Sequence, residues 1–470
     1  MAHPLYMNVC IFFHIFHRPM LAYGSFIWWR GITIAQNCKR LNHLQRTICL
    51  AITGAARTAP QLALEALLYL PRLEFYIRAE ARTTALRLQS QIKRRYSWRQ
   101  DHSSIIEEVY GNCQMLRAPV DYQLPIYIFD RPFRADNPML GAGTGEGGAD
   151  YPQFDRWFTE TAVINNNFGF GIFNPNTGRS YCGPLGIDAE ETQANLAAIL
   201  ECCVRIKKAN IGNQPIQILT SSLGAIKALR CHKIESKQVL DCVEILMEIA
   251  QRRHLTIAWT HSANENECFE KANVLAKVGA SRTPFGPGPF FPITDRKKRI
   301  LCQEWATETM VRSWHNVTDC NHTKSFVIAP NTKLTKQLLD LDKAKVSIVV
   351  SLITGHVRLN KHMHVLGIRD DPDCDRCGGG AETAMHFLCT CSGYGDLRRT
   401  IFGNERLIAS ETITSNLSRI FAFAQRSGRF PVLGSAPTNR HFSLYRPGGR
   451  NAGNNAAPPT PPGPPQQTIG

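Results

Sequence analysis

Four residues near the C-terminal end have the types and spacing that hold a metal ion in many proteins. Two residues separate Cys374 from Cys377, so both thiols can face one ion from a tight turn, and the glycines at 378–380 let the chain fold back. His386 and Cys391 follow, about one helical turn apart. Sulfur and imidazole ligands suit zinc, and four protein ligands close its coordination shell. The spacing therefore predicts a structural Zn²⁺ site, a zinc knuckle, over residues 374–391.

Two alternatives to this ligand set stay open from the sequence. Cys389 lies just before Cys391 and could take the fourth position in its place. The whole group could also be reduced thiols packed beside a core histidine, without a metal ion. The first alternative exchanges one ligand, whereas the second removes the site.

A second group of side chains has types that suit nucleic acid. Four cations with two aromatic rings among them lie near the end of the basic N-terminal region. Because cations bind phosphates and rings stack on bases, this segment is a candidate binding arm. A solvated helix end is the alternative interpretation. The residues of this arm are Lys93, Arg94, Arg95, Tyr96, Trp98 and Arg99.

Hydrophobic periodicity predicts the elements that position these groups. Residues 1–100 are expected to form basic helices, and residues 101–154 an irregular linker that includes the Gly-rich stretch 141–148. Residues 155–281 follow the order βββαβαβα, which describes an α/β (α+β) domain with a mixed sheet flanked by helices. The expected strands cover 157–161, 168–173, 180–185, 216–220 and 255–260, and the expected helices cover 190–208, 237–254 and 267–279.

The C-terminal part is expected to be helical and then disordered. A Pro-rich linker at 282–294 precedes a helical region over 295–405, with helices at 295–314 and 335–353, and this region carries the zinc knuckle. Residues 425–470 contain no Asp or Glu and are rich in proline, which predicts a disordered tail of polyproline II character. A passive tail is the favoured interpretation, and an SH3-like partner for it is the alternative.

Composition indicates which class of protein this is and which kinds of partner it could bind. Of the 470 residues, 43% are hydrophobic and 20% charged, which excludes wholesale disorder. The 54 Lys and Arg residues outnumber the 38 Asp and Glu residues, and the net charge of +16 favours a polyanionic partner. No apolar run is long enough to span a membrane, so no membrane partner is expected. The scattered cysteines are typical of reduced proteins and predict an intracellular location, in the cytoplasm or the nucleus.

Short motifs stand at both ends of the chain. The N-terminal motifs lie at 23–29, 41–46, 52–58 and 64–71, and the C-terminal ones are Thr354-Gly355-His356, Leu359-Asn360 and His362, ahead of the Cys/His group. Over residues 20–405 the chain resembles the C-terminal part of non-LTR retrotransposon polyproteins of the jockey-like arthropod kind. The resemblance places the N-terminal region just after the reverse transcriptase palm. Because the palm and its aspartate pair are missing, polymerase activity is not expected.

The same resemblance implies a ribonuclease H domain between the motifs. Ribonucleases of this fold use four carboxylates to hold two Mg²⁺ ions beside the scissile phosphate. The family's catalytic positions correspond here to Glu160, Asn195, Ser221 and Asn273. Of the four, only Glu160 carries a carboxylate. Mg²⁺ is therefore expected as a cofactor only if this ribonuclease H site is catalytically active. Glu191 and Glu270, each close in sequence to a substituted position, could supply replacement charge.

These observations lead to one functional expectation with two alternatives. The expectation is a retrotransposon-derived protein that binds RNA, DNA or RNA–DNA hybrids through a zinc knuckle and an inactive ribonuclease H-like domain. An active RNA–DNA hybrid ribonuclease is the first alternative. A decayed reading frame, or a scaffold without catalysis, is the second.

Overall fold

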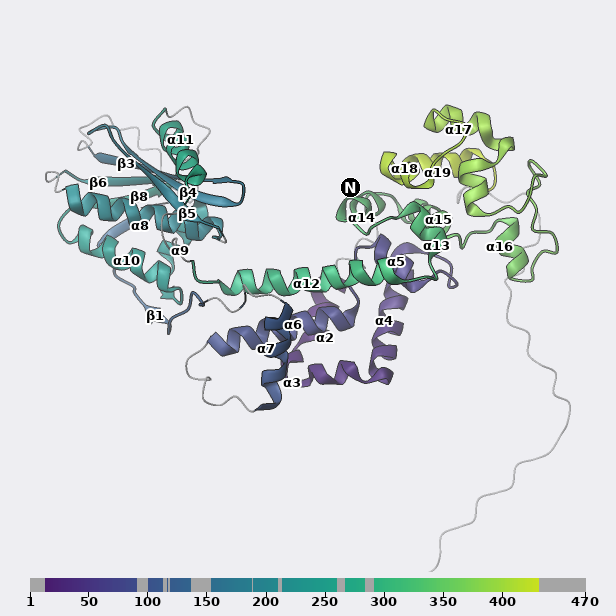
Figure 1. The fold of residues 1–470 in the computed structure, drawn as a ribbon, viewed down its shortest axis with the longest axis horizontal. Helices are drawn as coiled ribbons and strands as arrows, with labels where there is room; N and C mark the ends of the chain where they lie inside the picture. The colour runs from purple at the N-terminus through teal and green to yellow at the C-terminus, as the bar shows by residue number, and fades with distance from the viewer. Residues whose placement is uncertain are drawn as a thin grey trace, which may run out of the picture.

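The structure is a computed structural model that describes residues 13–90, 100–112, 116, 119–136, 154–187, 189–209, 214–259, 267–283 and 291–430. It contains a mixed-sheet domain and a helical body, which the long helix α12 (Asp295–Asn316) connects (Figure 1). The candidate arm at residues 93–99 and the proline-rich residues beyond 430 lie outside the described residues. Within the described residues, no helix has the length and apolar character needed to cross a membrane.

The sheet has six strands in the order β2-β8-β6-β3-β4-β5. The strands β3, β4 and β5 form an antiparallel meander, whereas β6, β8 and β2 run parallel to β3. The expected α/β class with a mixed sheet is therefore confirmed. The bounds are β2 (Phe133–Asp136), β3 (Asp155–Ile164), β4 (Asn167–Asn174), β5 (Arg179–Gly186), β6 (Ile216–Thr220) and β8 (Leu255–Trp259).

Local turn chemistry fixes the register of the meander. Asn165 and Asn166 both adopt positive φ, 49° and 65°, as a two-residue hairpin turn between right-handedly twisted strands requires. At the other end of the hairpin, the buried Asn174 amide donates to Asp155 Oδ1 over 2.6 Å. The indole of Trp157 donates to the second oxygen of the same carboxylate over 3.0 Å. Asp155 therefore ties the start of β3 to the end of β4.

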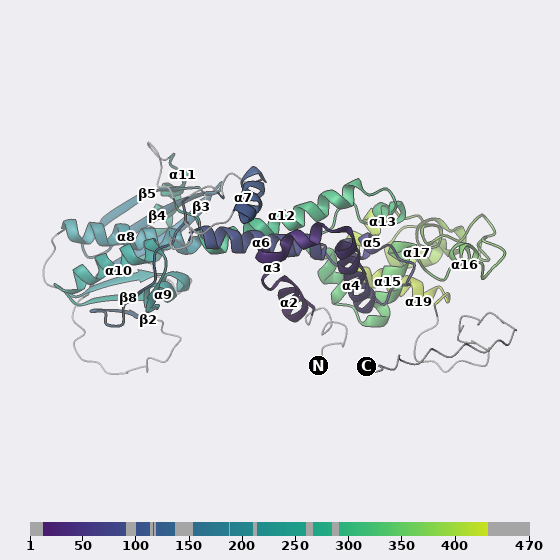
Figure 2. The ribbon, with the colours of Figure 1, turned by 90° about the horizontal axis from the view of Figure 1, so that it is seen from below.

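Helices cover both faces of this sheet. Trp157, Ile218 and Ile257 point to one face, where they pack against α8 (Glu191–Ala209), α9 (Leu223–Arg230) and α10 (Lys237–Ala250). Residues next to them in the strands point to the other face, and there Phe158 packs against α11 (Glu267–Ser281). Figures 1 and 2 show α8 and α10 on the side of the sheet opposite α11.

Glycines allow α11 to lie directly on β4. A Cβ atom at Gly171 would be 2.0 Å from the carbonyl oxygen of Ala272 and 2.4 Å from the nitrogen of Ala276. One at Gly169 would be 2.0 Å from the nitrogen of Ala280. The backbones of strand and helix therefore touch at these points, and only glycine fits between them.

The helical body joins two segments that the sheet domain separates in the sequence. Leu64 and Leu67 of the N-terminal segment belong to the same hydrophobic core as Val349, Phe387 and Phe423 of the C-terminal segment. The N-terminal elements are η1 (Phe13–His17), α2 (Arg18–Ala22), α3 (Ser25–Trp28), η2 (Trp29–Thr33), α4 (Ala35–Thr53), α5 (Gln61–Leu67) and α6 (Leu73–Ser90). The C-terminal helices are α13 (Asn321–Phe326), α14 (Thr332–Leu339), α15 (Lys343–Thr354), α16 (Asn360–Val365), α17 (Gly395–Phe402), α18 (Ala409–Ser415) and α19 (Leu417–Arg426).

This shared core corrects the expected separation of residues 1–100 from residues 295–405. Two further boundaries were also wrong. The expected helix over 335–353 is interrupted between α14 and α15, because the side chain of Asp342 accepts from the Lys345 nitrogen and starts a new helix. The expected tail over 425–470 begins too early, since Phe430 packs against Phe387 at a ring-centroid distance of 5.8 Å.

The interpretation of residues 101–154 as an irregular linker is wrong for a large part of that segment. Residues 100–112 form α7 (Gln100–Asn112), and β2 extends the sheet at its β8 edge. The helix is held because Glu108 forms an ion pair of 2.7 Å with the buried Arg82 of α6. The Arg82 guanidinium also lies 3.5 Å from the ring centroid of Trp305 in α12. These contacts join α6, α7 and α12, and the sequence pattern alone gave no sign of them.

The glycine contacts lead to a prediction for the stability of the sheet domain. Gly171→Ala should destabilise this domain by about 2 kcal/mol or more, because the new methyl group must displace helix backbone. Hydrogen exchange of the β3–β5 amides would measure this locally, apart from the rest of the chain. Gly111→Ala in α7 is the control, since its methyl group would meet nothing within 4 Å. Equal protection of β3–β5 in both variants would contradict the close helix–strand packing.

Candidate metal centre

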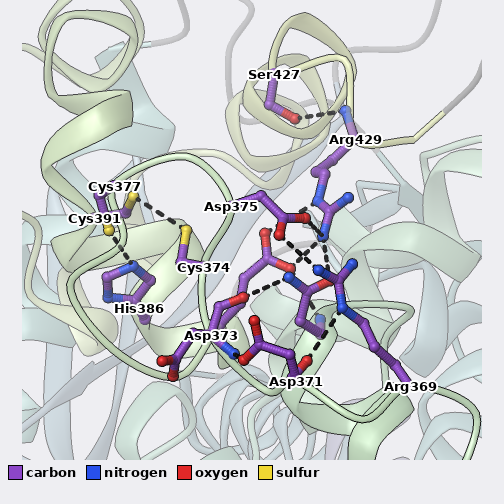
Figure 3. Close-up of polar contacts among 12 residues, drawn as sticks. Arg369, Asp371, Asp373, Cys374, Asp375, Cys377, His386, Cys391, Ser427 and Arg429 are labelled. Carbon is purple, nitrogen blue, oxygen red and sulfur yellow. Dashed lines mark hydrogen bonds and ion pairs between the residues drawn. The ribbon is translucent and has the colours of Figure 1, made fainter.

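Four side chains of the helical body converge as the sequence predicts. One ligand atom from each of Cys374, Cys377, His386 and Cys391 lies within 4.8 Å of the other three. The sulfurs of Cys374 and Cys391 are 3.8 Å apart, and the Cys377 sulfur is 3.3 Å from His386 Nε2 (Figure 3). This Cys₃His cluster could hold a metal ion.

A glycine-rich turn holds the first two cysteines. The Gly378 N–H donates to the Cys374 carbonyl oxygen over 2.9 Å, and the Cys374 N–H donates to the Gly380 carbonyl oxygen over 2.9 Å. Gly378 and Gly380 have φ values of 60° and 122°, which side chains with a Cβ rarely adopt. The Gly379 N–H points at the Cys377 sulfur over 3.4 Å and lowers the pKa of that thiol. The turn therefore favours the thiolate that a metal ion needs.

One turn of π-helix places the other two ligands. In η6 (His386–Thr390), the Cys391 N–H donates to the His386 carbonyl oxygen over 2.7 Å, five residues back. This wider turn carries Cys391 to the cluster. Cys389 is fully buried in the hydrophobic core and is not among the four residues whose ligand atoms converge. The structure thus favours Cys391 over Cys389 as the fourth ligand.

A buried arginine that sequence reasoning missed supports this turn. Arg398 of α17 donates from its guanidinium to the carbonyl oxygens of Phe387, Cys391 and Glu405. The bonds to Phe387 and Cys391 satisfy carbonyl groups in and just after the irregular turn. Arg398 acts through the backbone that holds Cys391, and no spacing pattern in the sequence could have identified it.

A second buried network supports the first cysteine. Glu382 is only 1% exposed and forms an ion pair with Arg429, and its Oε2 also accepts from the Asn360 N–H over 2.9 Å. The Asn360 side chain in turn donates to the carbonyl oxygen of Asp373, next to Cys374, over 2.5 Å. Figure 3 shows Arg429 on the side of Cys374 away from His386. Asn360 belongs to the Leu359-Asn360 motif, and this network explains how that motif positions the cluster.

The positions expected from the ribonuclease H resemblance lie in the sheet domain. Glu160 on β3 is 7% exposed, and burial raises the pKa of its carboxyl group. The nearby charge of Glu191 raises this pKa further, whereas a hydrogen bond from the Ser221 side chain lowers it in part. Among the described residues, Glu160 Oε1 has no hydrogen-bond partner. The structure therefore brings Glu160, Ser221 and Glu191 together.

The two asparagines do not restore the missing charge. The Asn195 amide donates to the Glu191 carbonyl oxygen over 2.8 Å, one turn back in α8. Asn273 is half-buried and follows Ala272, whose carbonyl lies against Gly171, the register partner of Glu160. Two Mg²⁺ ions need several hard anionic ligands, and this group of residues offers one buried carboxylate with one more nearby. The group does not fit a pair of Mg²⁺ ions.

No protein-family model matches the chain, and no curated protein is similar enough to count as a match.

The cluster geometry predicts metal retention that depends on four named residues. The full chain, purified under reducing conditions, should contain about one equivalent of a thiophilic metal ion and lose structure in the helical body when a chelator removes it. Cys391→Ser should lower the metal content severalfold, and elemental analysis would measure it. Cys389→Ser is the matched control and should keep the metal. Loss of metal in Cys389→Ser but not in Cys391→Ser would reverse the ligand assignment.

Proposed function

We propose that the chain is a nucleic-acid-binding protein derived from a non-LTR retrotransposon polyprotein. In this proposal, the helical body is the main binding surface and carries a structural zinc knuckle, and the sheet domain is ribonuclease H-like but catalytically impaired. The observation that carries the proposal is the meeting of two segments without acidic residues in the helical body that also carries the Cys₃His cluster.

These two segments are distant in the sequence and adjacent in the structure. Residues 1–64 contain no Asp or Glu, and neither do residues 343–369. At their junction, the Ser347 hydroxyl donates to the Gly54 carbonyl oxygen over 2.7 Å, and His356 Nδ1 is 3.0 Å from the Thr58 hydroxyl. The same junction therefore joins the N-terminal and C-terminal motifs of the retrotransposon resemblance.

The junction concentrates positive charge. Arg57 and Arg358 are exposed on its two sides, and Arg46 donates to the Arg57 carbonyl oxygen. Burial lowers the pKa of His356, and the neighbouring His362 and Arg46 lower it further. Arg46, Arg57 and Arg358 thus bring positive charge to a region whose two segments carry no carboxylate. A polyanion such as a nucleic acid backbone can pair with this charge and releases counterions on binding.

Two observations support the other parts of the proposal. The order β5-β4-β3-β6-β8, with an antiparallel meander followed by parallel strands, agrees with the strand order that the ribonuclease H resemblance implies. The Cys₃His cluster supplies four sulfur and nitrogen ligands, which match the closed tetrahedral shell of structural zinc and leave no position for a reacting water. When bound, zinc would hold the two loops of the knuckle together.

One observation favours an active hybrid ribonuclease as a second candidate function. Glu191 acts on the pKa of Glu160, so a second carboxylate does lie near the site. Against this, the pKa of Glu160 is raised, which disfavours the charged form that a Mg²⁺ ion requires. The impaired form is therefore the better supported of the two.

The charged junction predicts how binding depends on salt. Replacing both Arg57 and Arg358 by alanine should reduce the slope of log affinity against log salt concentration by about two, roughly one for each lost phosphate contact. A KCl series with a labelled RNA–DNA hybrid would measure this slope. Arg399→Ala is the matched control, because this exposed arginine is already paired with Asp396 and Glu405. An unchanged slope in the double variant would place the binding surface elsewhere.

A further inference from the structure

A small two-stranded ribbon projects from the sheet domain. It pairs β1 (Ile126–Tyr127) with β7 (Lys233–Ile234) in antiparallel register. The Ile128 N–H extends the pairing by donating to the His232 carbonyl oxygen over 3.0 Å. Ile234 is buried in the core of the domain, and Ile128 packs against that core. Figure 1 shows β1 at the margin of the domain, beyond α10. The ribbon is therefore anchored by its inward side chains.

The outward side chains of the ribbon form a stack of three rings. Tyr127 and Phe129 alternate with the inward Ile128, as strand geometry requires. Their rings lie at 17° to each other with centroids 6.3 Å apart. The Phe129 ring is followed by the His232 ring, with centroids 5.4 Å apart and an angle of 29°. His232 Nδ1 lies 3.2 Å from the Ile128 carbonyl oxygen, which fixes the orientation of the imidazole.

This stack is exposed to an unusual degree for aromatic residues. Phe129 is 69% exposed and Tyr127 is 59% exposed. Large apolar side chains are normally covered, so a group of them held outward by a hydrogen-bonded ribbon indicates an interaction surface. Because the ribbon already holds the rings in place, these side chains would lose little conformational freedom when a partner binds.

Cations lie on the helix turn that precedes the ribbon in the sequence. Lys227 and Arg230 are exposed on the last turn of α9, directly before the ribbon strand β7. Among the described residues, neither forms an ion pair with a carboxylate. Arg131 donates from its guanidinium to the carbonyl oxygens of Leu229 and Cys231, and so ties the end of α9 to the ribbon. The ribbon therefore presents ring faces beside unpaired positive charge.

We propose that the Tyr127–Phe129–His232 stack is a platform for the bases of single-stranded nucleic acid, with Lys227 and Arg230 on the adjoining phosphates. Unpaired bases stack on aromatic rings without regard to sequence, whereas the bases of a duplex are covered by their neighbours. This inference rests on the proposed function and adds a surface to it. The platform lies in the sheet domain, apart from the charged junction of the helical body.

The test uses the full chain and compares its binding to a probe with bases and to a probe that has only the sugar–phosphate backbone. One probe is a labelled oligothymidylate of about 12 nucleotides, and the other is an abasic oligonucleotide of the same length. Replacing Tyr127 and Phe129 together by alanine should weaken oligothymidylate binding at least about fivefold, since each stacked base contributes substantially. Binding of the abasic probe should stay unchanged. Phe129→Trp should keep the affinity, and oligothymidylate should quench the emission of the new indole.

The outcomes separate this inference from the proposed function. If the ring variants bind both probes as the wild type does, while the Arg57 and Arg358 double variant binds less, the platform is rejected and the proposed function stands. If no variant and no wild-type protein binds either probe or an RNA–DNA hybrid, both are rejected. If the alanine variants instead dissociate a dimer of the chain in light scattering, the ribbon is a protein interface and the platform is rejected.

Discussion

The helical body depends on one constraint, the hydrophobic core that residues 13–77 share with residues 314–424. Neither segment can bury its apolar face alone, so the chain on both sides of the sheet domain must meet before this body folds. The metal cluster depends on the same core, because Cys374, Cys391 and the intervening Phe387 are buried in it. The cluster is therefore part of a composite domain, and a short peptide around it would lack half of the core.

The charge distribution follows from this architecture. Bringing the two acid-free segments together concentrates positive charge near the junction of α4 and α15. In the proposed ribonuclease H-like domain, three of the four positions that the resemblance assigns to carboxylates are Asn195, Ser221 and Asn273. Fewer clustered negative charges mean less repulsion, so the sheet can keep its packing without bound metal ions. The proposed account therefore combines retained nucleic-acid binding with weakened metal-ion catalysis, and each half follows from where charge is present or missing.

Local signals predicted the sheet and the cluster well, and long-range contacts were missed. The apolar pattern predicted both ends of β6 correctly. The Cys/His spacing predicted the four residues whose ligand atoms converge. The shared core could not be inferred, since nothing in the sequence near Leu64 points to Val349 as its neighbour. Arg398 and Glu382 are single charged residues without a spacing pattern, and their roles appear only from their buried partners. The choice between Cys389 and Cys391 needed the π-helical turn, which spacing alone does not reveal.

The central claim, binding without catalysis, is tested most directly by one cleavage assay on an RNA–DNA hybrid that the chain is shown to bind. With Mg²⁺ or Mn²⁺, the wild-type chain should leave the hybrid intact. Completing the set of four carboxylates with Asn195→Glu, Ser221→Asp and Asn273→Asp, together with Glu160→Asp, should produce cleavage, while the single substitutions should do little because the groups act as a unit. Robust cutting by the wild-type chain, abolished by Glu160→Ala, would contradict the account and establish an active ribonuclease.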